Sequence, residues 1–151
     1  MPPTEDATPA LLREKPTWLI SQVAVHAHRL VADGLASAHA RGYDYRVLAA
    51  LHEFGPTSQA TLGRRTAIDK SDVVDTVDGL SRRGLVRRSS DLADRRRKSI
   101  TITRAGVKHF LRLDKVLVDI QETLLGPLST TERRVLLTLL ARLLKRDANY
   151  E

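Results

Sequence analysis

The 151-residue sequence contains no cysteine, which excludes disulfides, thiolate metal ligands and sensing by thiol oxidation. Aromatic residues make up only 4% of the chain, so the core must be aliphatic, and helices suit such a core. No apolar run approaches the ~20 residues needed to span a bilayer, and the N-terminus lacks the basic and apolar regions of a signal peptide. We therefore expect a cytoplasmic protein of one domain, with no membrane partner.

The positive charge of the chain is concentrated in one segment. The net charge is +7, and residues 55–104 contain 12 lysines and arginines against 6 aspartates, a local charge of +6. A basic surplus of this kind favours a polyanionic partner. The alternative is a solvated basic surface, so the position of these charges in the fold decides between the two.

Apolar residues spaced three and four apart indicate long amphipathic helices at both ends of the chain. One covers about 17–40, a second covers 104–125, and a third follows Ser129 and Glu132, whose spacing matches a capping box. Residues 1–16 hold prolines and acids and are expected to form a disordered tail. The apolar faces exceed what a small core can cover, so we expect a homodimer with interleaved terminal helices. A monomeric helical core is the alternative.

The middle of the chain predicts short helices followed by a strand pair. Asp44, Thr57 and Asp69 are each expected to cap a helix, and Ile68 to fill the turn between the second and third helices. Two strands follow, joined by a basic hairpin tip. The inward face of the third helix is expected to consist of Val73, Val74, Val77 and Leu80. The predicted fold class is mainly α (α+β), a winged helix-turn-helix with long N- and C-terminal dimerisation helices.

This arrangement has the parts of a lobe that lies on duplex DNA. In a helix-turn-helix, the early residues of the second helix enter the major groove, where Lys70 and Ser71 would meet phosphates or base edges. The four consecutive cations Arg95–Lys98 at the hairpin tip suit a narrow minor groove, whose negative potential attracts arginine. A solvated loop is the alternative for this charge run.

The chain also resembles the MarR family of bacterial transcription regulators over roughly residues 17–146. The matching residues are Asp69 and Ser71, Val77, Asp78 and Leu80, Arg83 to Val86, Asp94 to Arg96, Ile100, Ile102, Thr103 and Gly106. The resemblance implies a homodimer held by residues 17–43 and 104–146, in which each lobe (44–103) reads half of a pseudo-palindromic operator. Many members release DNA when a small phenolic or anionic compound binds between the dimer helices and the lobe.

Carried over by resemblance, Ser71 and its neighbours contact the major groove, Arg95 or Arg96 enters the minor groove, and Asp94 holds the wing by pairing with an arginine. The chain departs from the family at Asp72 and Asp75, where threonine and arginine are common. Acids repel phosphate, so these two must accept from cytosine, pair with arginines or face away. The expected DNA-binding residues are Ser58, Gln59, Lys70, Ser71, Asp72, Thr76, Arg82, Arg88, Arg95, Arg96 and Arg97.

Two further groups of side chains could form sites. The resemblance places an effector cleft near Trp18, Tyr43 and Tyr45, with packing as the alternative role for these aromatics. The histidines are His26, His28, His39, His52 and His109. Because His26 and His28 splay apart on a helix, we expect no metal, with a site across the dimer as the alternative.

No nucleophile elbow, phosphate loop or zinc-protease motif occurs, so we expect neither catalysis nor a cofactor. The sequence therefore predicts a dimeric, sequence-specific DNA-binding transcriptional regulator, a repressor released by a small aromatic or anionic effector. The alternative is a winged-helix protein-interaction adaptor with only nonspecific affinity for DNA.

Overall fold

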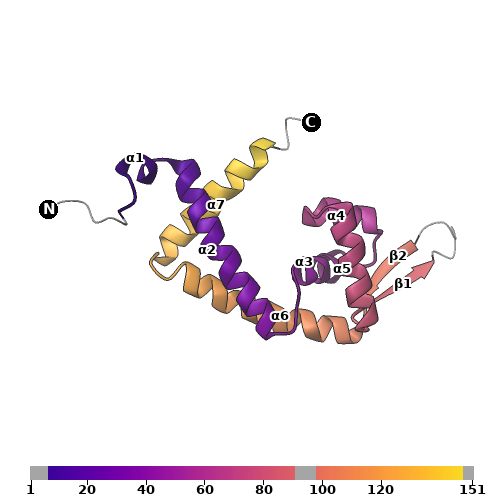
Figure 1. The fold of residues 1–151 in the computed structure, drawn as a ribbon. Helices are drawn as coiled ribbons and strands as arrows, with labels where there is room; N and C mark the ends of the chain where they lie inside the picture. The colour runs from indigo at the N-terminus through magenta and orange to yellow at the C-terminus, as the bar shows by residue number, and fades with distance from the viewer. Residues whose placement is uncertain (1–6, 91–97, 148–151) are drawn as a thin grey trace.

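A computed structural model describes residues 7–90 and 98–147, with side chains as far as residue 145 (Figure 1). Its elements are α1 (Ala10–Arg13), α2 (Pro16–Ser37), α3 (Asp44–Phe54), α4 (Gln59–Thr66), α5 (Lys70–Arg82), β1 (Val86–Ser90), β2 (Lys98–Ile102), α6 (Arg104–Leu124) and α7 (Thr130–Asp147). The two strands form one antiparallel sheet. The predicted mainly helical winged fold is confirmed.

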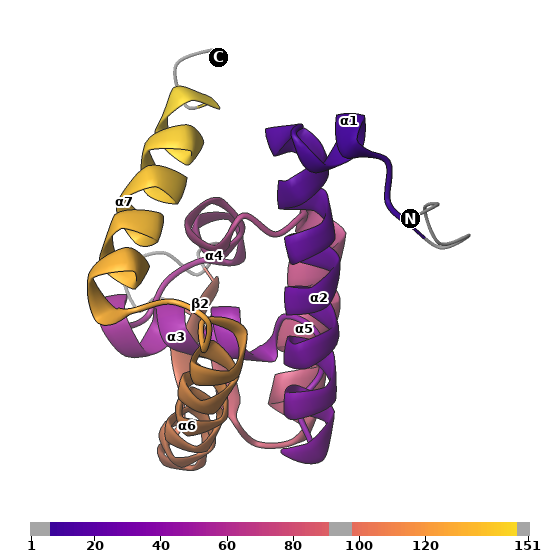
Figure 2. The same ribbon diagram turned by 90° about the vertical axis from the view of Figure 1, so that its left-hand side faces the viewer.

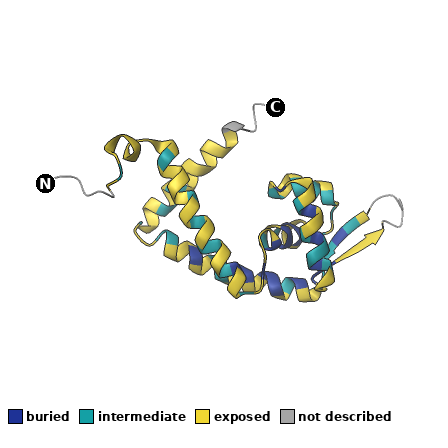
Figure 3. Cartoon of the chain, in the orientation of Figure 1, coloured by how far each residue is buried: buried dark blue, intermediate teal, exposed yellow. Residues whose placement is uncertain are grey.

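The molecule consists of a packed lobe and an extended helical arm (Figures 1 and 2). The lobe contains α3, α4, α5 and the sheet, while α1, the start of α2 and α7 lie at the other end of α6. Buried residues gather in the lobe and where it meets α6 (Figure 3). The most deeply buried side chains are Val47, Leu48, Leu51, Leu62, Val73, Val77, Leu80, Ile100 and Leu113. This aliphatic core agrees with the low aromatic content.

The turn between α4 and α5 is held by local backbone chemistry. Ala67 adopts the left-handed region with φ of 53°, and its neighbour Ile68 is buried, so the predicted plug is confirmed. Asp69 occupies the N-cap position of α5, but its side chain makes no capping hydrogen bond. The cap of α4 is Ser58, whose Oγ accepts from the Thr61 amide at 3.2 Å.

The prediction that Thr57 caps α4 was wrong. Thr57 and Ile100 exchange two backbone hydrogen bonds, of 3.1 Å and 2.8 Å, and so form a bridge beside β2. This bridge holds the start of α4 against the sheet. Local sequence did not reveal it because Thr57 and Ser58 are both good capping residues.

The sheet and α6 are joined by a tight corner. β1 and β2 pair from Val86 opposite Ile102 to Ser90 opposite Lys98. Thr103 Oγ1 donates to the Gly84 carbonyl at 2.7 Å and accepts from the Gly106 amide at 3.0 Å, so one side chain caps α6 and ties it to the end of α5. A Cβ at Gly106 would overlap the Leu85 carbonyl oxygen. Glycine is therefore required where α6 begins.

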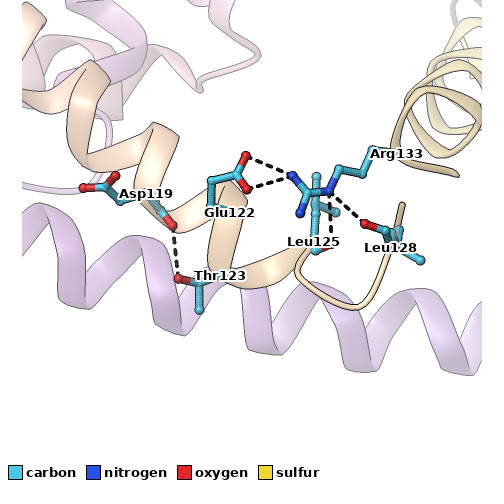
Figure 4. Close-up of polar contacts among 6 residues, drawn as sticks. All are labelled: Asp119, Glu122, Thr123, Leu125, Leu128 and Arg133. Atoms are coloured by element: carbon cyan, nitrogen blue, oxygen red, sulfur yellow. Dashed lines mark hydrogen bonds and ion pairs between the residues drawn. The ribbon is translucent and has the colours of Figure 1, made fainter. Parts of the chain in front are cut away.

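The corner between α6 and α7 is clamped by Arg133 (Figure 4). Its Nη1 donates to both Glu122 carboxylate oxygens, at 2.9 Å and 2.8 Å, and its Nε donates to the Leu125 and Leu128 carbonyls at 3.2 Å. The predicted capping box is confirmed by the reciprocal bonds between Ser129 and Glu132. Together these contacts fix the direction in which α7 leaves α6.

The N-terminal part differs from expectation in two places. Residues 10–13 of the expected tail form α1, and Pro16 is the first residue of α2, a position that suits proline. α2 ends at Ser37, before the expected end near residue 40, because His39 turns left-handed with φ of 56°. The Ala40 amide then donates back to Leu35 at 2.8 Å. No helix within the described residues is both long and apolar enough to cross a bilayer.

Candidate nucleic-acid interface

The exposed side of α5 near its N-terminus presents a mixed surface. Lys70, Ser71, Val74 and Asp75, together with Asp69, border an open hollow. Lys70 and Ser71 are exposed in the first turn, where free amides and the helix dipole attract anions. This surface, the α5 face, brings Lys70 and Ser71 together with the carboxylates of Asp69 and Asp75.

Val74 was predicted to face inward, and that prediction was wrong. Its exposed fraction is 36%, and it lies one turn from Lys70 on the α5 face. Val73, Val77 and Leu80 already fill the buried side of the helix. An apolar group among polar neighbours on this face can contact a thymine methyl group.

Two other predicted DNA contacts on α5 lie elsewhere on the helix. Thr76 is half-buried and donates its hydroxyl to the Asp72 carbonyl at 2.6 Å. Arg82 lies near the C-terminus of α5 and shares a cleft with Thr76. The structure therefore separates these residues from Lys70 and Ser71.

Ser58 and Gln59 lie at the start of α4. The hydroxyl of Ser58 is engaged in capping, and Gln59 is half-buried. The Gln59 Nε2 atom is buried without a hydrogen-bond partner among the described residues. An unpaired buried donor is costly in free energy.

Arg88 on β1 forms an ion pair with Asp78 on α5. The pair holds the wing against α5 and offsets one of the acids near the candidate interface. Arg95, Arg96, Arg97 and Asp94 lie outside the described residues, so their wing-tip roles stay predictions. The flanking strands end at Ser90 and Lys98.

A cleft of about 720 Å³ lies between the α2–α3 connection and α5. Its lining includes the cations Arg41, Arg82 and Arg83, the ring of Tyr43, and Asp75. Tyr43 is thus the only one of the three expected effector residues that lines this cleft. Trp18 lies near the start of α2, about 27 Å along the helix from its last turn at 1.5 Å per residue.

Tyr45 packs elsewhere. Its ring is stacked on Phe110 with centroids 5.6 Å apart, and its hydroxyl donates to Asp114 Oδ1 at 2.8 Å. Burial and the bond to the Asp114 carboxylate raise the pKa of Tyr45 to about 12. Of the two roles that the sequence allows for this residue, packing between α3 and α6 is the one that the structure supports.

Asp44 was expected to cap α3, but that position belongs to Tyr43. The Asp44 carboxylate is buried and accepts from the Arg41 amide and from Arg83 Nη1, both at 2.9 Å. Sequence reasoning missed this pair because its members are 39 residues apart. Among the described residues, no group of three histidine, aspartate or glutamate side chains is placed to hold a metal ion.

Comparison with known proteins decides the family. Residues 40–97 match the model of the MarR family. A solved structure of a probable transcriptional regulator from Pseudomonas aeruginosa is 32% identical, with a TM-score of 0.79 over 87% of this chain and 98% of that one. The chain belongs to the MarR family. The family resemblance predicted from the sequence is confirmed.

Two further relatives carry functional names. The PcaV transcriptional regulator from Streptomyces coelicolor, solved with its natural ligand, is 28% identical, with a TM-score of 0.78 over 92% of this chain and 98% of that one. The HTH-type transcriptional repressor NicR from Pseudomonas putida is 34% identical over 102 residues, which are 68% of this chain. The chain spans 65% of the length of that curated relative.

Proposed function

We propose that this chain is a homodimeric, sequence-specific DNA-binding repressor that works in the cytoplasm and is released from its operator by a small molecule. The observation that carries the proposal is the α5 face, because Lys70 and Ser71 are exposed at the N-terminus of α5, in the same lobe as the arginines of β1 (Figure 1). The repressor name of NicR and the family membership support the same function. The proposal assigns binding roles to these residues and no catalytic step.

The α5 face offers three kinds of contact to a major groove. Lys70 would meet a phosphate, and Ser71 a phosphate or base edge. Val74 would contact a thymine methyl, and Asp75 would accept from a cytosine amine. Arg87, exposed on β1, adds a further cation to the lobe, while the charge of Arg88 is paired with that of Asp78.

A second copy of the chain would cover the apolar faces of the helical arm. None of the described α7 side chains is buried, although the helix is rich in leucine. The exposed apolar residues of α2 and α7 include Leu19, Ile20, Val23, Val135, Leu139, Leu140, Leu143 and Leu144. Burying these faces against a two-fold mate is the commonest solution for such surfaces. Leu143→Glu should convert a dimer to single chains in sedimentation, whereas a dimer of unchanged stability would refute this interface.

The cleft beside α5 is the proposed effector site. Arg41 and Arg82 are exposed at its lining, while Arg83 is held by Asp44. A volume of about 720 Å³ lies in the range of small-molecule sites. The cationic lining and Tyr43 suit an aromatic carboxylate. Because α5 forms one wall, ligand and operator would both act on the same helix.

Selection from a pool of random duplexes tests the DNA-binding proposal. A dimer that reads two half-sites should return a two-fold motif whose halves lie about 34 Å apart. A protein-interaction adaptor, the second candidate, would return no sequence preference. That result would overturn the proposal.

Titration of the selected duplex then tests the α5 face. Lys70→Gln should weaken binding and flatten the dependence of log affinity on log salt by about one unit for each phosphate that the side chain neutralises. Lys115→Gln is the matched control, because Lys115 is exposed on α6, away from the α5 face. Equal affinities and salt slopes for the two variants would contradict the role of Lys70.

A further inference from the structure

One buried histidine lies where three helices meet. Asp44 begins α3, Arg83 directly follows α5, and His109 and Arg112 are on α6. The exposed fractions of Asp44 and His109 are only 4% and 5%. This junction connects the end of the candidate DNA-reading helix to the long helix of the arm, and the proposed function assigns no role to His109.

Both ring nitrogens of His109 face guanidinium groups. Arg112 Nη2 lies 3.2 Å from Nδ1, and Arg83 Nη2 lies 3.4 Å from Nε2. A neutral imidazole has one acceptor nitrogen, so it accepts from one of these arginines while its N–H faces the other. A protonated ring has no acceptor at all, so both contacts would then set donor against donor.

The electrostatic surroundings also disfavour a charged ring. Burial, then Arg83 and Arg112, lower the pKa of His109 below its ordinary value, and His39 acts in the same direction. Among the described residues, Asp44 is the one group that acts in the opposite direction. Its carboxylate is already engaged by Arg83 and by the Arg41 amide. A positive charge on His109 would therefore add to a cluster whose single anion is already shared.

We propose that His109 makes the α3–α5–α6 junction a proton-sensitive joint, closed by the neutral ring and loosened by its protonation. Protonation would push Arg83 and Arg112 away from the ring. Because Arg83 also holds Asp44, the movement would weaken the link between the end of α5 and the start of α3. Acid would thus act on the orientation of α5 through a group 26 residues from Arg83 along the chain.

The sign of the pH effect follows from the direction of the shift. An unfolded chain takes up a proton on this histidine near pH 6.5, whereas the folded chain resists protonation until a lower pH. The stability associated with neutral His109 is therefore complete above about 6.5 and is lost as the pH falls toward the folded-state pKa. Within that window a single proton changes the unfolding equilibrium constant by up to about tenfold per pH unit.

Nuclear magnetic resonance of the intact wild-type chain tests the joint directly. The His109 ring should titrate below the ordinary histidine range. The Arg41 amide, which donates to Asp44, should shift with the same midpoint, because the joint couples the two. The proposal would be overturned if the His109 ring titrated in or above the ordinary histidine range. It would also be overturned if the chemical shift of the Arg41 amide did not change as His109 titrates.

Denaturation at a series of pH values gives a second test. His109→Gln keeps a side chain that can accept from one arginine but cannot be protonated. Wild type should lose stability on acidification faster than this variant, by up to about tenfold in the unfolding constant per pH unit. The control is His28→Gln, since His28 is exposed on α2 and its variant should follow wild type. Parallel pH profiles for wild type and His109→Gln would refute the joint, and neither measurement involves DNA.

Discussion

Arg83 Nη1 lies 2.9 Å from Asp44 Oδ2, and this ion pair joins the end of α5 to the start of α3. The Asp44 side chain is 5% exposed and the Arg83 side chain 34%. The carboxylate also receives the Arg41 amide, so it satisfies a loop donor and a cation together. The position of the candidate DNA-reading helix therefore depends on one buried acid.

Asp44→Ala should lower the free energy of unfolding by about 2–3 kcal/mol. The substitution leaves the Arg41 amide and the Arg83 guanidinium without their acceptor, and Arg83 is partly solvated, which limits the loss. The matched control is Asp78→Ala, which breaks the more exposed pair with Arg88 and should cost less than about 1 kcal/mol. Urea denaturation at one protein concentration measures both, and equal losses would contradict a structural role for Asp44.

Gly106→Ala should destabilise the chain by about 3 kcal/mol or more, because a methyl group there overlaps the Leu85 carbonyl and forces α6 away from the sheet. Gly79→Ala is the opposite case. Nothing lies within 4 Å of a Cβ at Gly79, and alanine favours the helix interior by about 0.5–1 kcal/mol. Thermal denaturation should move the two midpoints in opposite directions. A harmless Gly106→Ala would show that α6 does not begin in this close contact.

Tyr45 should give the chain an alkaline stability limit. Its pKa of about 12 in the fold exceeds the ordinary value of 10.0, so its stabilising contribution is complete below pH 10 and is lost as the pH rises toward 12. Tyr45→Phe should remove the tyrosinate absorbance that develops near pH 12, and Tyr43→Phe should leave it in place. If Tyr43→Phe, and not Tyr45→Phe, removed this high-pH absorbance, the bond between Tyr45 and Asp114 would be contradicted.

Local patterns in the sequence predicted helices α2 to α7 and the strand pair, but not α1, because caps and helical periodicity act within a few residues. The boundaries failed where distant partners decided them. Thr57 pairs with Ile100, a contact that no local pattern encodes. The end of α2 depends on the left-handed conformation of His39, which is uncommon for residues other than glycine.

Only part of the candidate site was predicted, because only part of it depends on local sequence. The exposure of Lys70 and Ser71 was predictable from their position at the start of a helix. Val74 was wrongly assigned to the core, because the apolar character of a residue does not reveal which face of the helix is covered. The cluster of Asp44, Arg83 and His109 had no sequence signal, because its members come from three helices. Tertiary packing, rather than any motif, brings these charges together.

An aromatic carboxylate should stabilise the chain through the cleft beside α5. We expect 4-hydroxybenzoate, used as a probe, to raise the melting temperature saturably in the absence of DNA. A ligand at 100 times its dissociation constant adds about 2.7 kcal/mol to the stability. For a chain of this length, that gain corresponds to a rise on the order of 5–10 °C.

Arg41→Gln should shift the melting response to higher probe concentration, because it removes a cation from the cleft while leaving the Arg41 amide that binds Asp44. Lys115→Gln removes one positive charge from the exposed surface of α6 and should leave the response unchanged. The melting temperature in sodium chloride at the same ionic strength as the probe solution serves as a further control, because it measures the effect of charge screening alone. If wild type, Arg41→Gln and Lys115→Gln respond alike, the probe does not bind through Arg41, and the cleft loses its role as the anion site.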